Sequence, residues 1–219
     1  MANELILTFH GLGEPPAHVS ASERRVWTPV KWLHAVLDAL PAAGVRVTFD
    51  DANVSDVEQA LPALADRGRT AEFFVLAGEL GAPGRLTRAE VRRLHGAGMA
   101  IGSHGLHHRD WRTASDGELV RELAGSREAL STIIDSDVAE AACPFGSYDR
   151  RVLRALRAAG YRRAYTSDGR PSASTQWLWS RTTVTRDRPL TDWLTLVAAG
   201  PSRRRAPAAI AKTYLKRIR

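Results

Sequence analysis

The chain has 219 residues, of which 44% are hydrophobic and 25% charged, a composition typical of a globular protein with a buried core. Its single cysteine excludes an intrachain disulfide, and no apolar stretch is long enough to cross a bilayer. The formal net charge of +7 comes from residues 202–219, which hold seven basic residues and no acidic one, so the rest has 24 basic and 24 acidic residues. This balance argues against a nucleic-acid-binding face, and without an apparent leader sequence we expect a cytoplasmic protein.

Strand and helix patterns alternate along the chain, with a polar loop after the first strand. In chain order the patterns predict strand 4–9, helix 29–42, strand 45–49, helix 55–68, strand 71–76, helix 87–98, strand 99–103, helix 115–131, strand 138–143, helix 150–160, strands 161–166 and 178–184, and helix 190–199. Capping boxes are predicted for Ser55 with Glu58, Thr87 with Glu90, and Ser115 with Glu118. The alternation indicates parallel strands joined by crossover helices.

Polar residues follow four of the predicted strands. His10 comes after the first strand, Asp50 and Asp51 after the second, residues 104–108 after the fourth and residues 144–149 after the fifth. Because active sites of parallel α/β folds form at the carboxyl ends of the strands, we expect these groups at one rim. Two imidazoles and one carboxylate with open positions left over would form a catalytic metal site, and the other aspartate would remain a free base.

The spacing of the histidines leaves the second imidazole open. His104 pairs with His107 at i, i+3 and with His108 at i, i+4, and one helical turn would put either pair on the same side. Spacing alone favours His108 only slightly. In the alternative interpretation, all three are half-exposed loop histidines and the aspartates are turn residues. The joint presence of these groups at one rim favours a functional site.

Three segments together resemble the polysaccharide deacetylases of carbohydrate esterase family four. They are "VTFDDANVSDVEQALPALADRGRTAEFFV", "MAIGSHGLHH" and "CPFGSYDRRVLRALRAAGY", and the resemblance extends from about residue 5 to residue 166. It implies an α/β fold, a distorted (β/α) barrel of about seven parallel strands, that removes acetyl groups from sugars. We therefore expect a catalytic domain over residues 1–201 and a basic C-terminal tail over residues 202–219.

The resemblance also implies roles for individual residues. Asp50 corresponds to the general base, and Asp51, His104 and His108 correspond to the ligands of one divalent metal ion, for which zinc is expected. The substrate-binding residues are expected to be Pro144, Phe145, Gly146, Tyr148 and Trp111. The backbone N–H of Phe145 would help to hold the oxyanion.

The chain departs from the family pattern at several positions. Ala52 replaces the glycine of "TFDDG", and Cys143 stands where an arginine often lies near the base. No histidine follows His108, so the general acid is unassigned; His10 is a candidate, with a packing or hydrogen-bonding role as the alternative. Arg181 lies on a late strand from which it could reach the pocket.

These observations predict a metal-dependent hydrolase that removes acetyl groups, N-acetyl in the first instance, from a carbohydrate of surface polysaccharide or glycan metabolism. A catalytically weak or inactive carbohydrate-binding pseudoenzyme of the same fold is the alternative, prompted by the departures above. A further alternative is another metal hydrolase on a related barrel, such as a cyclic-amide hydrolase. The partner is expected to be the acetylated carbohydrate and not a nucleic acid.

The basic tail suggests a second contact. Residues 206–219 can form a helix with Ile210, Tyr214, Leu215 and Ile218 along one side, the pattern of a helix that lies on an anionic membrane surface. A peripheral membrane location would follow. In the alternative, the same apolar stripe packs on the barrel as its last helix.

Overall fold

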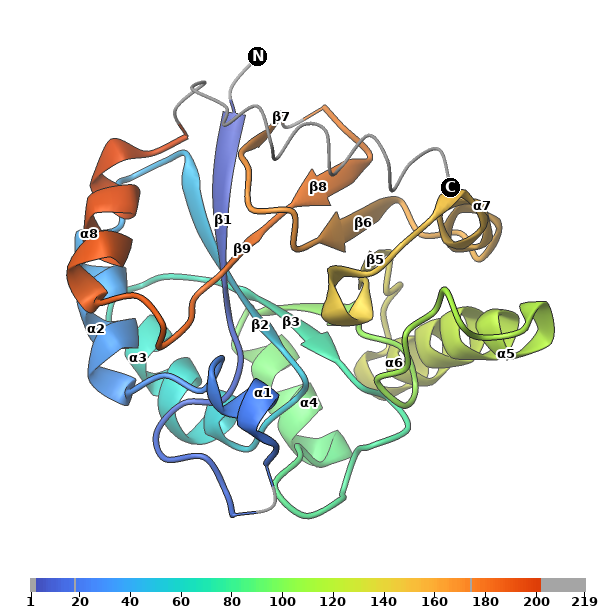
Figure 1. The fold of residues 1–219 in the computed structure, drawn as a ribbon. Helices are drawn as coiled ribbons and strands as arrows, with labels where there is room; N and C mark the ends of the chain where they lie inside the picture. Colours follow the sequence, from blue (N-terminus) through green and yellow to red (C-terminus); the bar gives the residue numbers. More distant parts are fainter. Residues whose placement is uncertain (1–2, 18, 174, 202–219) are drawn as a thin grey trace.

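A computed structural model describes residues 3–17, 19–173 and 175–201, so the helix predicted in the tail lies outside the described residues. Among the described residues, no helix has the length and apolar character that a membrane span requires. The strands form one curved sheet, which closes into a nearly complete barrel (Figure 1). This arrangement confirms the predicted α/β barrel.

Parallel strands make up most of the sheet. Its path is β7 (Ser172–Ala173), β1 (Asn3–Phe9), β2 (Val45–Asp50), β3 (Glu72–Val75), β4 (Ala100–Ser103), β5 (Glu140–Ala142), β6 (Arg163–Thr166) and β8 (Leu178–Ser180). β7 is antiparallel to β1, and β9 (Thr182–Thr183) is parallel to β1. The stretch 178–184, predicted as one strand, is therefore two strands on opposite sides of the opening in the barrel, separated by Arg181.

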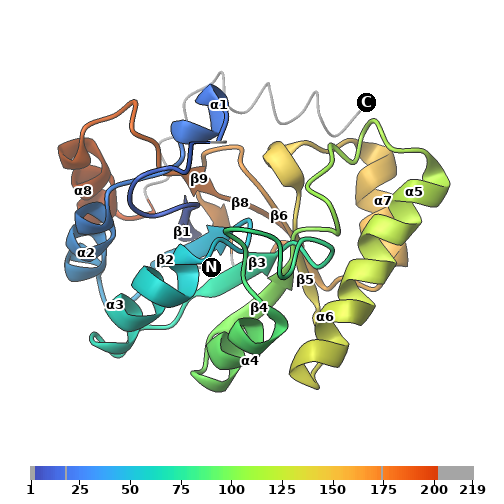
Figure 2. The same ribbon diagram turned by 90° about the horizontal axis from the view of Figure 1, so that it is seen from below.

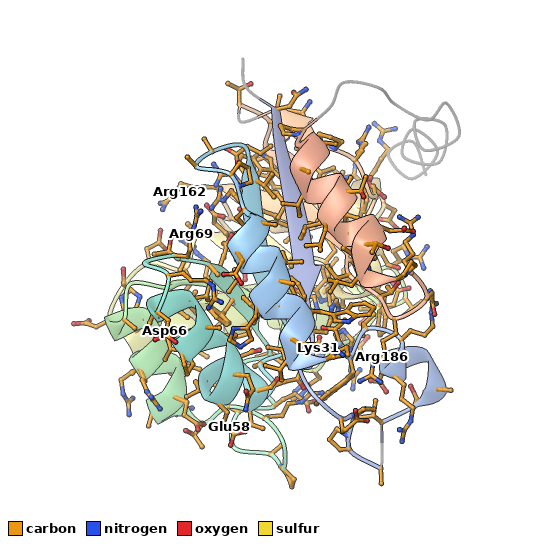
Figure 3. All side chains as sticks on the ribbon, turned by 90° about the vertical axis from the view of Figure 1, so that its left-hand side faces the viewer. Lys31, Glu58, Asp66, Arg69, Arg162 and Arg186 are labelled. Carbon is orange, nitrogen blue, oxygen red and sulfur yellow. The ribbon has the colours of Figure 1, made fainter. Side chains whose placement is uncertain are left out.

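Helices cover the outside of the sheet (Figure 2). In chain order the helical segments are α1 (Ala21–Arg24), α2 (Val30–Ala39), η1 (Asp56–Ala60), α3 (Leu61–Ala65), α4 (Arg88–Gly96), α5 (Asp116–Val120), η2 (Arg121–Gly125), α6 (Ser126–Ile134), η3 (Pro144–Gly146), α7 (Arg150–Ala158) and α8 (Leu190–Ala199), of which α1 and η3 lie at the carboxyl ends of the strands and not in the outer layer (Figure 2). η1 and η2 are π-helical turns continuous with the α-helices that follow, and η3 is a 3₁₀ turn. Charged side chains such as Lys31, Glu58 and Asp66 point outward from the helical layer (Figure 3).

Two of the three predicted capping boxes are present, at Thr87 and at Ser115. The third is wrong, because Ser55 has a helical backbone conformation and its hydroxyl instead accepts a hydrogen bond from the Leu12 N–H at 3.1 Å. The loop before residue 27 contains a capping box that was not predicted, in which Ser20 begins the short helix α1. Local spacing thus identifies a cap only where the chain before it is extended.

Alternation along the strands divides the side chains between the barrel interior and the helical layer. The interior cluster consists of Ile6, Phe74, Ala142, Tyr165 and Trp179. Gly102 of β4 makes room for this cluster, since a Cβ there would lie 2.5 Å from the Phe74 ring. The larger clusters of buried side chains lie between the strands and the surrounding helices.

The amino ends of the strands enclose a group of charged side chains. Glu140 accepts hydrogen bonds from the Tyr165 hydroxyl at 2.6 Å and from Arg163 at 2.7 Å. Glu72 is buried beside Glu140 and one of its carboxyl oxygens has no hydrogen-bond partner. Burial, reinforced by the neighbouring Glu140, raises the pKa of Glu72 well above its usual value. Glu72 therefore holds its proton to a higher pH than a freely exposed glutamate does.

Candidate metal and catalytic centre

The predicted polar groups meet at the carboxyl ends of β2 and β4. Asp50 is the last residue of β2, Asp51 follows it directly, and His104 comes immediately after β4. Ligand atoms of Asp51, His104 and His108 all lie within 4.8 Å of one another. The parallel register of β2, β3 and β4 brings these strand ends to one rim, as the sequence predicted.

The donor atoms of this cluster fit a divalent cation. The Oδ1 atom of Asp51 lies 3.5 Å from His104 Nε2 and 3.4 Å from His108 Nε2, and it is buried without a hydrogen-bond partner. His104 donates its Nδ1–H to the Ala142 carbonyl at 2.9 Å, which leaves the Nε2 lone pair available as a ligand. Two imidazole nitrogens and one carboxylate oxygen are a donor set that zinc and similar ions accept.

Protonation states in the cluster favour metal binding. Burial lowers the pKa of His104 to about 4, despite the opposing effect of Asp50, so its imidazole is neutral at neutral pH. Burial raises the pKa of Asp51, but His10 and His108 outweigh this effect and the net shift is downward. Metal ligands must be a neutral histidine and an ionised carboxylate, and both conditions are met near pH 7.

The structure brings His108, and not His107, to the cluster. The His107 side chain is 50% exposed and lies 3.8 Å from Glu79, away from Asp51. The segment after β4 is a loop and not a helical turn, and His108 has a left-handed backbone with φ of 47°. Backbone conformation therefore selects between the two histidines, which the spacing left open.

A buried carboxylate supports the loop that holds the histidines. Glu122 accepts hydrogen bonds from the Leu106 N–H at 2.7 Å and the His107 N–H at 3.3 Å. It lies in the π-helical turn η2, where it is 4% exposed. Gly105 approaches it with φ of 86°. Glu122 could not be identified from the sequence, because an acidic residue in a predicted helix gives no local sign of burial.

Asp50 is held by an arginine that is distant in sequence. Arg181 donates from Nη1 to Asp50 Oδ1 at 2.6 Å and from Nη2 to Oδ2 at 2.7 Å, and its side chain is fully buried. Burial raises the pKa of Asp50, but Arg181, followed by His104, outweighs it and lowers this pKa to about 2. Asp50 is thus an ionised carboxylate at neutral pH.

Cys143, at the position where an arginine often lies near the base in the family, does not face Asp50. Cys143 packs with Trp111, Tyr148 and Val152 in the cluster between the sheet and the helices. Its neighbour Ala142 faces the barrel interior instead. A side chain at position 143 points away from Asp50 because successive residues of a strand alternate between the two faces of the sheet.

Strained backbone is concentrated around the site. Of the five non-glycine residues with positive φ among the described residues, four are Asp51, Ala52, His108 and Phe145. Each such residue costs on the order of 1–3 kcal/mol, and such strain is typical of functional sites. At Ala52, φ is 55°, a conformation that glycine adopts freely, so the family's glycine at this position has a conformational reason.

The expected substrate-binding residues divide into two groups. Phe145 is 63% exposed and its ring centroid lies 4.4 Å from that of His108, so it borders the metal cluster together with the buried Pro144 and Gly146. Trp111 is fully buried, and Tyr148 is buried with its hydroxyl donating to Asp168 at 2.8 Å. Trp111 and Tyr148, which were expected to bind substrate, therefore have no ring face open to a carbohydrate in this structure, because both rings pack in the core.

His10 lies close to the two aspartates. It follows β1, and its Nδ1 atom is buried without a hydrogen-bond partner. Its charge contributes to the lowered pKa values of both Asp50 and Asp51. His10 is therefore within electrostatic reach of the catalytic rim, and its role as general acid stays a prediction.

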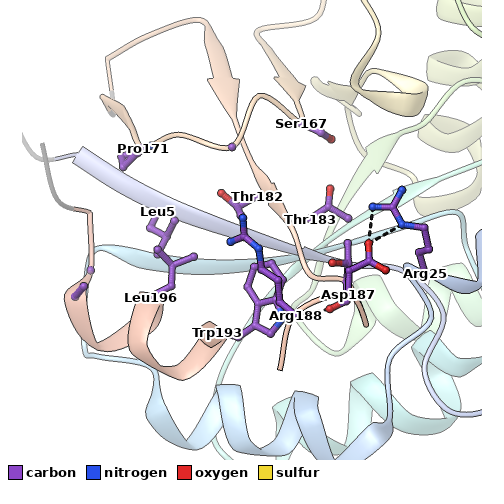
Figure 4. A pocket seen from close by; sticks show the side chains of 14 residues that line it. Leu5, Arg25, Ser167, Pro171, Thr182, Thr183, Asp187, Arg188, Trp193 and Leu196 are labelled. Atoms are coloured by element: carbon purple, nitrogen blue, oxygen red, sulfur yellow. Dashed lines mark hydrogen bonds and ion pairs between the residues drawn. The ribbon is translucent and has the colours of Figure 1, made fainter. Parts of the chain in front are cut away.

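A separate pocket of about 530 Å³ lies beside β9 and α8 (Figure 4). Its lining includes Leu5, Thr183 and Trp193, and the ion pair of Arg25 with Asp187, at 2.6 Å, closes one end. None of the three candidate metal ligands lines it. We therefore place the chemistry at the rim and not in this pocket.

Comparisons with known proteins agree with the geometry. The protein YxkH of Bacillus subtilis (strain 168), whose name describes it as a polysaccharide deacetylase, is 23% identical to this chain over 136 residues. The match covers 62% of this chain and 49% of that protein. The chain thus spans about half the length of that relative. The Streptococcus pyogenes deacetylase PplD in complex with acetate has a similar fold, with a TM-score of 0.77, 19% identity, and coverage of 89% of this chain and 97% of that one.

A second solved structure and a family match complete the comparison. IcaB from Ammonifex degensii has a TM-score of 0.74 and 19% identity, and the match covers 90% of this chain and 98% of that one. The sequence model of the family described as polysaccharide deacetylase matches residues 38–164, which is more than half of the chain. The chain belongs to the polysaccharide deacetylase family.

Proposed function

We propose that the protein is a metal-dependent hydrolase that cleaves N-acetyl groups from a carbohydrate. Membership of a family of deacetylases gives the reaction class, and the observation that supports metal dependence is the unpartnered Asp51 Oδ1 between two histidine Nε2 atoms. Beside it lies Asp50, which is ionised and whose two carboxylate oxygens both accept hydrogen bonds from Arg181. A ligand set next to a separate carboxylate is the arrangement that hydrolysis of an amide needs.

Asp51, His104 and His108 would hold one divalent cation, and zinc suits their donor set. When bound, such an ion polarises the acetyl carbonyl and lowers the pKa of a coordinated water. Asp50 accepts the proton of the attacking water, since it is ionised at neutral pH. A protonated His10 donates its proton to the leaving amine as the C–N bond breaks, so the products are acetate and a free amino sugar. The proton that Asp50 accepted then passes to solvent, from which His10 is protonated again.

The Phe145 peptide borders the same place. Its N–H is proposed to donate to the oxyanion that develops on the acetyl oxygen. The exposed Phe145 ring, which contacts the His108 ring, and the buried Pro144 and Gly146 would form one wall of the carbohydrate groove. We propose a cytoplasmic location, with the basic tail (residues 202–219) attaching the enzyme to an anionic membrane where a lipid-linked glycan is the substrate.

The test measures acetate release from a panel of N- and O-acetylated sugars, with the metal content of the purified protein determined in parallel. Asp50→Asn is expected to retain metal and lose about 10²–10⁴-fold in turnover, the usual contribution of a general base. His10→Ala is expected to retain metal and lose turnover through failed protonation of the amine. A metal-loaded protein that releases no acetate from any sugar would contradict the proposed function, and normal turnover of either variant would remove that residue from the mechanism.

A further inference from the structure

We propose that Arg181 is a positioning residue that decides which of two adjacent aspartates binds the metal. By holding Asp50 at both carboxylate oxygens, it keeps Asp50 out of the ligand set and leaves Asp51 as the carboxylate ligand. The inference rests on the proposed metal-dependent function. It extends that function to a residue outside all three sequence segments that carry the family resemblance.

Arg181 is itself rigidly held. Its backbone N–H donates to the Thr166 carbonyl at 2.9 Å, and its own carbonyl accepts from the Gly169 N–H at 2.9 Å. The guanidinium lies 4.9 Å from the Phe74 ring centroid and 5.7 Å from that of Tyr165, and its Nη1 is 3.3 Å from the Thr48 hydroxyl. These contacts come from β2, β3 and β6 and from the loop that follows β6. The barrel as a whole therefore fixes where the guanidinium points.

Both aspartates are within reach of the histidine ligands. Asp50 Oδ2 lies 3.8 Å from His104 Nε2, and Asp51 Oδ1 lies 3.5 Å from the same atom. Proximity alone would allow either carboxylate to serve as ligand, or both. The asymmetry lies in their other partners, because Arg181 occupies both oxygens of Asp50, whereas Oδ1 of Asp51 has no hydrogen-bond partner.

The bidentate pair prevents Asp50 from turning toward the histidines. Rotation of the carboxylate would break two short, charge-assisted hydrogen bonds inside a buried site, where a replacement from water is not available. Each carboxylate oxygen retains a second lone pair, so Asp50 can still accept a proton. Among the described residues, no other arginine or lysine forms an ion pair with Asp50, so the restraint depends on Arg181.

The test compares Arg181→Met with Arg163→Met. Arg163 is the control, since it also forms a 2.7 Å ion pair, with Glu140, but at the opposite ends of the strands, where both side chains are partly exposed. Cobalt(II) replaces the native ion, because its visible absorption reports the number and type of ligands. In Arg181→Met we expect Asp50 to join the ligand set and change the spectrum, with kcat lowered about 100-fold and KM little changed, as for a misplaced reacting group. Arg163→Met should keep the wild-type spectrum and kcat.

A double variant tests the exchange of roles directly. Asp51→Asn should lose cobalt, and adding Arg181→Met should restore part of the binding because the released Asp50 replaces the missing ligand. Arg181→Lys keeps the charge but offers a single donor group, so it should give a kcat between those of wild type and Arg181→Met. If the methionine variant does not fold, the lysine variant takes its place in the test.

The proposal is overturned if Arg181→Met, or the lysine variant in its place, has the wild-type cobalt spectrum, or if the double variant is as free of cobalt as Asp51→Asn. These readouts do not depend on turnover. A wild-type protein that binds cobalt but releases no acetate would refute the proposed function while the spectra still decide the role of Arg181. Acetate release by wild type together with unchanged variant spectra would refute only the role of Arg181.

Discussion

Replacing Gly105 by alanine should damage the metal site through Glu122. The new Cβ would lie 2.7 Å from Glu122 Oε2 and 3.2 Å from Trp111 Nε1, on a residue whose φ is 86°. The left-handed backbone costs a non-glycine residue about 1–2 kcal/mol. The displaced carboxylate would also weaken its bonds to the Leu106 and His107 N–H groups, at about 1.5–3 kcal/mol for each bond to a charged group.

The unfolding free energy should therefore fall by roughly 2.5–5 kcal/mol, counting the strain and the loss of one such bond. Gly98→Ala is the matched control, because its φ is 83° but nothing lies within 4 Å of the new Cβ. It should lose only about 1–2 kcal/mol, the cost of the backbone strain. Urea unfolding, followed by fluorescence, measures both values.

Metal affinity gives an independent readout of the same perturbation. Since Glu122 positions the loop between His104 and His108, Gly105→Ala should weaken metal binding by about 10–100-fold, the usual effect of disturbing a residue that supports the ligands. Gly98→Ala should bind metal normally. Equal losses of stability in the two variants, with equal metal affinity, would refute the idea that Glu122 holds the loop.

Three further predictions follow from other parts of the chain. His108→Ala should lower the metal content sharply and His107→Ala should not, as measured on the purified proteins; the reverse result would make His107 the second histidine ligand. The folded-state pKa of Glu72 is raised, so the folded protein holds a proton that the unfolded chain releases, and the unfolding free energy should decline as pH rises above the usual value of 4.5 toward the raised one. Glu72→Gln should remove this part of the decline in urea titrations between pH 5 and 9, and identical slopes for both proteins would count against it. Deleting residues 202–219 should abolish binding to anionic vesicles at low salt and leave activity on a soluble sugar intact, whereas unfolding of the shortened protein would show that the tail belongs to the fold.

Local sequence patterns were sufficient for most of the strands and helices, apart from α1, β7 and the division of 178–184 into two strands, and for most of the metal site. Helix α8 and the caps at Thr87 and Ser115 lie where the periodicity and spacing placed them. Asp51 and His104 could be found because each directly follows a strand, and parallel strands bring their carboxyl ends to one rim. These features depend on a few consecutive residues and on one topological rule.

Tertiary structure decided the features that depend on distant partners. Ser55 is not a cap because the Leu12 N–H, 43 residues away, uses its hydroxyl. Trp111 is a core residue because the helices α5 and α7 close over it, and no local pattern separates such a ring from one that binds sugar. The choice of His108 over His107 came from the backbone of a loop that has no periodicity.

The pairing of Arg181 with Asp50, at the centre of the site, also could not be predicted from local sequence patterns. It lies 131 residues from Asp50, in the short break between two strands that the sequence pattern joins into one. Hydrophobic periodicity reports only which face of an element is buried, so it predicted the alternation of parallel strands and helices and the rim on which the site stands, whereas the barrel was implied by the family resemblance. Which charged side chain crosses the barrel to meet Asp50 depends on closure of the sheet, because only closure brings β2 opposite the break between β8 and β9.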